Sequence, residues 1–170
     1  MTLAVVAFPR LEDADRAWIE SFRTAHDPQA TRIAVHFTLV FPVDAPVDDV
    51  AREVAVVAGV TVPFAFVARR TTVVTDATQS HVFLIPDEGA AEITALHSRL
   101  YSGVLKPHLR TDIPFLPHMT IGAVPDSTAA LRLAAQVDAN ARVVRGTIDA
   151  LELIDITAAR IQSVATHTFN

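Results

Sequence analysis

The hydrophobic pattern of the first residues changes from the period of a strand to that of a helix. The apolar run within "MTLAVVAFPR", residues 1–10, predicts a first strand. Apolar residues then recur every three or four positions, and acidic residues stand near the start of this stretch, which predicts an amphipathic helix. The predicted buried face of this helix consists of Leu11, Ala14, Trp18, Phe22 and Ala25.

The next segments continue this alternation up to the middle of the chain. The segment "VHFTLVF", residues 35–41, is rich in β-branched and aromatic residues and predicts a strand. A helix is predicted from Pro46 onward, because valines follow it at helical spacing. Residues 62–75 and 80–86 predict two strands joined by a polar turn, and therefore a hairpin.

The second half of the chain begins the same order again after Pro86. A predicted helix leads to the strand "HMTIGAV" at residues 118–124. A second helix should follow, capped by Asp126 or Ser127, and two last strands are predicted at residues 146–157 and 160–169. The predicted buried face of this second helix consists of Leu131, Ala134 and Val137.

Both halves therefore follow the order helix, strand, helix, strand, strand, which indicates an internal duplication. We expect one α+β domain over residues 1–170, with repeats at roughly 8–86 and 88–169. A chain of 170 residues with 51% hydrophobic content can form one domain with a substantial core. The alternative is that an α+β chain alternates such elements without any duplication.

Two short motifs stand at equivalent places in the two halves. "HFTL" begins at His36 and "HMTI" begins at His118, 82 positions later (118 minus 36). Because side chains alternate along a strand, each histidine shares a face with its threonine, Thr38 or Thr120, and the apolar residues face the other way. A pseudo-twofold axis between the repeats would bring the four side chains together across one cleft. In the alternative reading, each histidine is hydrogen-bonded at a sheet surface and each threonine reflects β propensity.

A pair of imidazoles suits acid and base catalysis, because a histidine can hold or release a proton near neutral pH. Phosphodiester cleavage needs one group to remove a proton from the nucleophile and another to protonate the leaving oxygen. Thr38 and Thr120 could donate hydrogen bonds to the nonbridging phosphate oxygens. This scheme requires no metal, and although Asp112 lies near the second motif, no cluster with ligand spacing is evident.

Charge and composition narrow the classes of partner and compartment. The formal net charge of -5 argues against an extended surface for a nucleic-acid duplex. The chain has no cysteine, so it can contain neither a disulfide nor a thiolate site, and we expect a cytoplasmic location. The apolar start lacks a basic leader and is too short to cross a bilayer, so we expect no membrane association.

The motifs "HFTL" and "HMTI", with "PFLPHMTIG" around the second, resemble the paired signature of the 2H phosphoesterase superfamily, particularly its 2'-5' RNA ligase-like branch. The resemblance implies that His36 and His118 are the catalytic pair and that Thr38 and Thr120 bind phosphate. It implies a two-lobed, pseudo-twofold fold with antiparallel sheets facing a central cleft, helices outside, and both termini in one lobe. It also implies hydrolysis of 2',3'-cyclic phosphates, or chemistry at 2'-5' links, without metal or cofactor.

The expected partner is a small cyclic nucleotide or an RNA terminus, because one Tyr and one Trp provide little aromatic platform for a long single strand. We expect a monomer. A catalytically inactive protein that binds a nucleotide or an RNA end in the same cleft is the alternative function. A purely structural or interaction domain is a third hypothesis.

Four further residues are candidates for substrate binding, each with a structural alternative. Either Arg70 or its neighbour Arg69 could bind phosphate, although a solvated strand edge suits the other. His81 could line the cleft or be a surface histidine. Arg110, in the loop before the second motif, could guide substrate or be solvated. Phe115 could stack on a base, or the loop could pack against the core.

Overall fold

The computed structural model describes residues 1–157 and 161–170. The predicted start of the last strand, Arg160, lies outside these described residues. In chain order the elements are β1 (Leu3–Ala7), β2 (Arg10–Leu11), α1 (Asp13–His26), β3 (Phe37–Val43), α2 (Val47–Gly59), β4 (Phe64–Thr75), β5 (Ser80–Glu88), α3 (Ala90–Leu100), a 3-10 turn (Lys106–His108), β6 (Met119–Val124), α4 (Ser127–Ala139), β7 (Val144–Ile148), β8 (Ala150–Asp155) and β9 (Gln162–Thr168).

The described strands form one curled antiparallel sheet in the order β2-β7-β4-β5-β6-β3-β1-β8-β9. Its middle is narrow, because β3 and β6 are joined only through the residue pair Phe37 and Met119. This junction divides the molecule into a β3 half, with β3, β1, β8 and β9, and a β6 half, with β6, β5, β4, β7 and β2. The first and last long strands, β1 and β9, both lie in the β3 half, as the resemblance implied.

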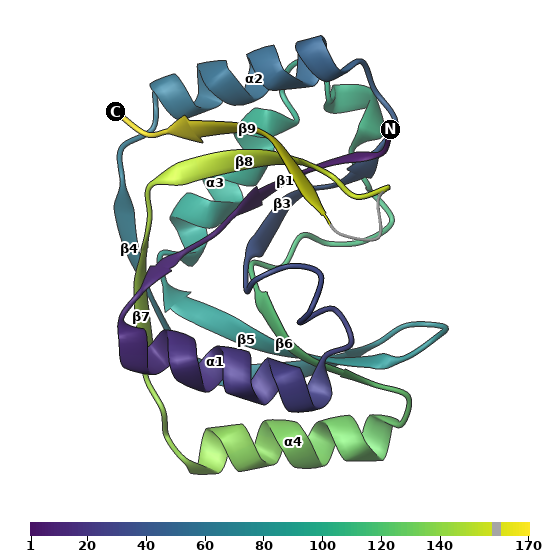
Figure 1. Ribbon diagram of the computed structural model, residues 1–170, viewed down its shortest axis with the longest axis vertical. Coiled ribbons are helices and arrows are strands. Elements are labelled where there is room, and N and C mark those ends of the chain that lie inside the picture. Colours follow the sequence, from purple (N-terminus) through teal and green to yellow (C-terminus); the bar gives the residue numbers. More distant parts are fainter. Residues whose placement is uncertain (158–160) are drawn as a thin grey trace.

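Helices cover the outside of each half. In the β3 half, α2 contacts β8 and β9, and α3 contacts β3, whereas in the β6 half α1 contacts β6, and α4 contacts β4 and β5. Figure 1 shows α2 and α4 at opposite ends of the molecule with the sheet curling between them. The expected two-lobed α+β fold is therefore confirmed. Within the described residues, no helix combines the length and apolar character needed to cross a membrane.

Each half of the sheet draws strands from both stretches of the predicted repeat. The β3 half combines β1 and β3 from the first part of the chain with β8 and β9 from the second. The β6 half combines β4 and β5 with β6 and β7. The duplication over residues 8–86 and 88–169 stays a prediction, but neither stretch forms a lobe by itself.

The buried face of α1 differs from the predicted one by one position along the helix. Asp15, Ile19 and Arg23 are buried, whereas Ala14 and Ala25 are exposed. Two charged residues can occupy this face because both have partners: Asp15 accepts from the Arg142 guanidinium at 3.1 Å, and Arg23 is held by carboxylates. The predicted Trp18 and Phe22 still pack against the core as partly buried residues, so the apolar pattern was wrong for Ala14 and Ala25 and missed the two charged positions.

Two details of the second half also differ from the predictions. In α4 the buried residues include Ala130 in place of the predicted Leu131, which is 59% exposed. The predicted single strand at 146–157 is two strands, β7 and β8, separated at Asp149. The Asp149 carboxylate forms an ion pair with Arg10 at 2.9 Å. The break between the two strands at Asp149 lets β7 pair with β4 in the β6 half, while β8 pairs with β1 in the β3 half.

Candidate active site

The two motifs meet at the junction between the halves of the sheet. Phe37 and Met119, which are opposite each other in the antiparallel pair, are both almost completely buried. Continuing this register places His36 beside Thr120 and Thr38 beside His118. Directly opposed residues of antiparallel strands have Cβ atoms about 5 Å apart. Each histidine is therefore next to the threonine of the other motif, on the face opposite the buried core.

A cavity of about 250 Å³ opens on this face. Its wall includes His36, Thr38 and Thr120, so three of the four motif residues border a single space. His118 is not on the wall itself, but it lies near the others, because the positive charge of His36 contributes to lowering its pKa. In the described part of the chain, neither threonine hydroxyl has a protein hydrogen-bond partner, so both are available to a ligand.

Both motif histidines are held by the same local hydrogen bond. The Nδ1 of His36 lies 2.8 Å from the carbonyl oxygen of Ala34, and the Nδ1 of His118 lies 2.7 Å from that of Leu116. A carbonyl oxygen only accepts, so each Nδ1 carries a proton and donates. In the neutral ring Nε2 is then the unprotonated nitrogen. Both motifs thus present the nitrogen that exchanges protons in the same way.

The surroundings of His118 favour its neutral form. Its ring is stacked on Phe83, with centroids 3.6 Å apart and planes inclined by 19°. Burial, with smaller contributions from the charges of His36 and His81, lowers the pKa of His118 to about 4 against the opposing hydrogen bond to Leu116. At neutral pH this imidazole is therefore a proton acceptor.

His36 has a more polar environment. Its ring meets Phe8 at a centroid distance of 5.9 Å and a 60° tilt, so the contact is looser than the stack on His118. Burial lowers the pKa of His36, and the hydrogen bond to Ala34 raises it. Among the nearby charges, Arg23 lowers this pKa while Asp27 and Glu20 raise it.

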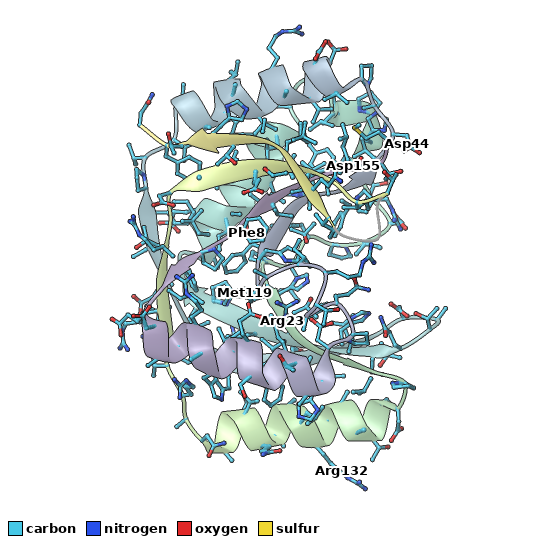
Figure 2. All side chains as sticks on the ribbon, viewed as in Figure 1. Phe8, Arg23, Asp44, Met119, Arg132 and Asp155 are labelled. Carbon is cyan, nitrogen blue, oxygen red and sulfur yellow. The ribbon has the colours of Figure 1, made fainter. Side chains whose placement is uncertain are left out.

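Beneath His36 lies a charged network that the sequence reasoning missed. Arg23 is 1% exposed and binds the carboxylates of Asp27 at 3.0 Å and Glu20 at 3.1 Å, and the carbonyl of Ile33 at 2.9 Å. Glu20 also accepts from the backbone N–H of Val35 at 2.9 Å. The network therefore ties the end of α1 to the segment that leads into the first motif. Figure 2 shows Arg23 in the middle of the molecule, above α1 in this view.

A signal for this network was present in the sequence. Glu20, Arg23 and Asp27 follow each other at helical spacing of three and four residues, just before the first motif. The predicted buried face contained only apolar positions, so these three charged residues fell outside it.

One wall of the cavity is apolar, which the sequence also did not reveal. It is formed by β1, β8 and neighbouring segments, whose side chains make a small separate hydrophobic cluster. The wall residues are Ala4, Val6, Ile33, Ile154, Ile156 and Ile161. A ligand held by the histidines and threonines would rest an apolar or flat group against this wall.

Of the four candidate binding residues, the structure places one at the cavity. His81 is on its wall, and its Nε2 lies 2.9 Å from Oδ2 of Asp76. Arg70 is on β4, with a side chain 67% exposed and paired to Asp87 at 2.9 Å, and Arg69 pairs with Glu88 at 2.6 Å. Neither arginine lines the cavity, because the acidic end of β5 binds both.

The two candidates in the loop before β6 also point elsewhere. Arg110 is paired with Asp112 at 2.6 Å. Phe115 stacks on His97, with centroids 3.8 Å apart and planes inclined by 7°, and packs against the core. Neither lines the cavity, so Phe115 occupies the packing role that we considered as its alternative. No group of three or more His, Asp or Glu residues in the described ranges could hold a metal ion.

Comparisons with known proteins identify the family and the fold. A model of the 2'-5' RNA ligase superfamily matches residues 11–160. No curated protein matches the chain. Among solved structures, TT0787 of Thermus thermophilus is 18% identical with a TM-score of 0.69, covering 99% of this chain and 98% of that chain.

Two further structures show the same fold over their whole lengths. E. coli LigT complexed with 3'-AMP is 15% identical with a TM-score of 0.64, covering 99% of this chain and 97% of that chain. Kluyveromyces marxianus Usb1 is 9% identical with a TM-score of 0.57, and the match covers 99% of this chain and 98% of that chain. At such identities the likeness concerns the fold.

Proposed function

Since the chain belongs to the 2'-5' RNA ligase superfamily, we propose that it is a metal-independent phosphoesterase acting on a 2',3'-cyclic phosphate or a 2'-5'-linked nucleotide or RNA end. The observation that carries this proposal is the matched anchoring of two imidazoles beside one cavity. His36 and His118 each donate from Nδ1 to the carbonyl two residues earlier, which leaves Nε2 for proton transfer. Catalysis by such a pair requires two proton-transfer groups on opposite sides of phosphorus.

The different surroundings of the two histidines support different roles for them. His118, with its pKa lowered to about 4, removes a proton from water through Nε2 as the water oxygen attacks phosphorus. Burial and the charge of Arg23 lower the pKa of His36, whereas Asp27 and Glu20 raise it. A bound anionic phosphate would act in the same direction as these carboxylates, so we assign His36 as the ring that carries a proton in the complex. It gives this proton to the ribose oxygen as the bond from phosphorus to that oxygen breaks.

The remaining cavity residues fit the binding of a nucleotide. Thr38 and Thr120 donate hydrogen bonds to the nonbridging oxygens as negative charge develops. The apolar wall supports a nucleobase or another flat group. The fold similarity to LigT, which has been seen with 3'-AMP, supports a ligand of this size. The net charge of -5 favours a nucleotide or an RNA terminus over an extended duplex.

Removal of either imidazole tests the proposal. We expect His36→Ala and His118→Ala each to lower kcat for a nucleoside 2',3'-cyclic phosphate by about 10²- to 10⁴-fold, the contribution of one acid or base. His108→Ala is the matched control, because His108 is exposed and does not line the cavity, and it should retain full activity. Activity should also survive EDTA. Turnover that persists in both cavity variants would overturn the proposal.

One observation favours the alternative of a nucleotide-binding or RNA-end-binding protein without turnover. Burial lowers the pKa of both histidines, so without a ligand neither ring is charged at neutral pH to serve as the acid. Saturable binding of a nucleotide with no product would support this alternative. The monomeric state and the cytoplasmic location stay predictions.

A further inference from the structure

We propose that His81, held by Asp76, forms a second anion-binding site in the cavity, which takes a second phosphate on the same substrate. This inference rests on the proposed function, because it concerns the cavity that the two motifs border. The substrate class that it names is a nucleotide with one phosphate at the 2' or 3' position and another at the 5' position.

Asp76 is held rigidly in the turn between β4 and β5. Its Oδ1 accepts from the backbone N–H of Thr78 at 2.7 Å, from the Thr78 hydroxyl at 2.7 Å and from the backbone N–H of Gln79 at 3.0 Å. These bonds keep the pKa of Asp76 well below its usual range, so the carboxylate is charged at neutral pH. Its other oxygen, Oδ2, accepts from Nε2 of His81 at 2.9 Å.

His81 faces the same side of the sheet as the reacting groups. Along β5, Val82 and Leu84 are buried in the core, so His81 and Phe83 point to the opposite face. The His81 and Phe83 rings lie 5.7 Å apart, and Phe83 stacks in turn on His118. His81 is thus connected to the second motif by a row of rings on one face.

The ring of His81 is turned the other way from those of the motif histidines. His36 and His118 use Nδ1 for a carbonyl and leave Nε2 to the substrate, whereas His81 uses Nε2 for a carboxylate. No protein group in the described part of the chain bonds Nδ1 of His81. When this nitrogen also carries a proton, the imidazolium donates to Asp76 on one edge and to an anion on the other.

The distance along β5 separates this site from the reacting phosphate. Phe83 pairs with Thr120 across the strands, and His81 is two residues further along β5, which corresponds to about 7 Å of strand. This spacing is too long for a third ligand on the phosphorus atom beside Thr120. It suits a phosphate on the other side of one ribose.

Arg23 does not provide this second site, although it also lines the cavity. Its Nε donates to Asp27, one terminal nitrogen donates to Glu20, and the other donates to the carbonyl of Ile33. With all three nitrogens engaged, the guanidinium has a structural role. Among the described residues of the cavity wall, His81 keeps a ring nitrogen, Nδ1, that no protein group uses and that donates to an anion when it carries a proton.

The test compares two stable ligands by titration calorimetry, so it does not depend on turnover. The probes are adenosine 3'-monophosphate and adenosine 3',5'-bisphosphate. We expect the intact protein to bind the bisphosphate roughly tenfold more tightly, the scale of one charge-assisted hydrogen bond. His81→Ala should remove this preference, and Asp76→Ala should reduce it, while His108→Ala should preserve it.

Equal affinities for the two ligands in the intact protein would overturn the inference, as would a preference that survives His81→Ala. If a 2',3'-cyclic nucleotide is hydrolysed while the two affinities are equal, this inference alone fails. If the bisphosphate is preferred but no cyclic nucleotide is hydrolysed, the second site stands and the proposed catalysis fails. A thermal melt of each variant confirms that the change in affinity does not come from unfolding.

Discussion

The β3 half and the β6 half hold their histidines in the same way but surround them differently. In both, Nδ1 donates to the carbonyl two residues earlier, at 2.8 Å for His36 and 2.7 Å for His118. In the β6 half the ring lies flat on Phe83, and its charged neighbours are histidines. In the β3 half the ring meets Phe8 loosely and lies above a network of one arginine and two carboxylates.

This difference shows how a nearly symmetric frame can support an asymmetric reaction. Backbone geometry fixes the orientation of both rings, and neighbouring side chains set their proton affinity. In the proposed reaction His118 of the β6 half is the proton acceptor, because burial lowers its pKa to about 4. His36 of the β3 half is the proposed acid, and Asp27 and Glu20 raise its pKa against the effects of burial and Arg23. Four predictions test this difference between the two halves.

Removing the charge beneath His36 should have the largest effect. We expect Arg23→Met to lower the free energy of unfolding by about 3 to 5 kcal/mol, because it leaves the buried Asp27 carboxylate without its partner. Urea denaturation measures this loss. Arg52→Ala removes an exposed pair with Asp49 and should change stability by about 0.5 kcal/mol or less. A similar effect of both variants would contradict the structural role of the network.

Loss of either motif hydroxyl should have the next largest effect, and the two effects should be equal. Thr38→Val and Thr120→Val each remove one hydrogen bond to a charged phosphate, worth about 2 kcal/mol, so kcat/KM should fall by roughly 30-fold in each. Steady-state kinetics on a 2',3'-cyclic nucleotide measures both. If only one variant is impaired, the two hydroxyls do not share one phosphate.

Acidification should destabilise the protein through His118. The pKa of this residue is about 4 in the folded protein, against 6.5 for an unperturbed histidine, so the unfolded chain binds the extra proton between these values. Stability is therefore complete above pH 6.5 and declines as pH falls toward 4, by on the order of 1 kcal/mol for a partly exposed ring. Thermal melts of the wild type and His118→Asn across this window measure the contribution, which the variant should lack.

The aromatic contacts should produce the smallest and most specific effect. Phe83→Ala opens the His118 ring to water, so its pKa should rise and the acid limb of the kcat/KM profile should move to higher pH. Phe8→Ala removes a looser contact with His36, so the limb of the kcat/KM profile that reports His36 should move less. The two pH profiles measure this difference directly. Equal shifts would show that stacking does not distinguish the two halves.

Strand periodicity was sufficient to predict much of the fold and the centre of the site. A period of two placed His36 and Thr38 on one face and Phe37 on the other, and the structure has Phe37 buried and the polar pair on the cavity. In the second motif the same period placed Thr120 on the polar face and Met119 on the other, and the structure has Thr120 on the cavity wall and Met119 buried. These predictions held because alternation depends only on local backbone geometry.

The rest depended on contacts that the sequence pattern does not contain. The burial of Arg23 depends on partners at positions 20, 27 and 33, which converge only when the chain folds. Arg70 lies away from the cavity because the β4 pairing with β5 has a register shift between Ala68 and Arg70, and Asp87 lies across the hairpin. A bulge of this kind breaks simple alternation, so the outward direction of Arg70 could not be inferred.

The junction at Phe37 and Met119 also limits which substitutions this sequence can accept. These two buried residues stand directly behind the four motif side chains and pair with each other. A change in the size of either side chain therefore alters the packing beneath both motifs, so the residue at one position constrains the residue at the other.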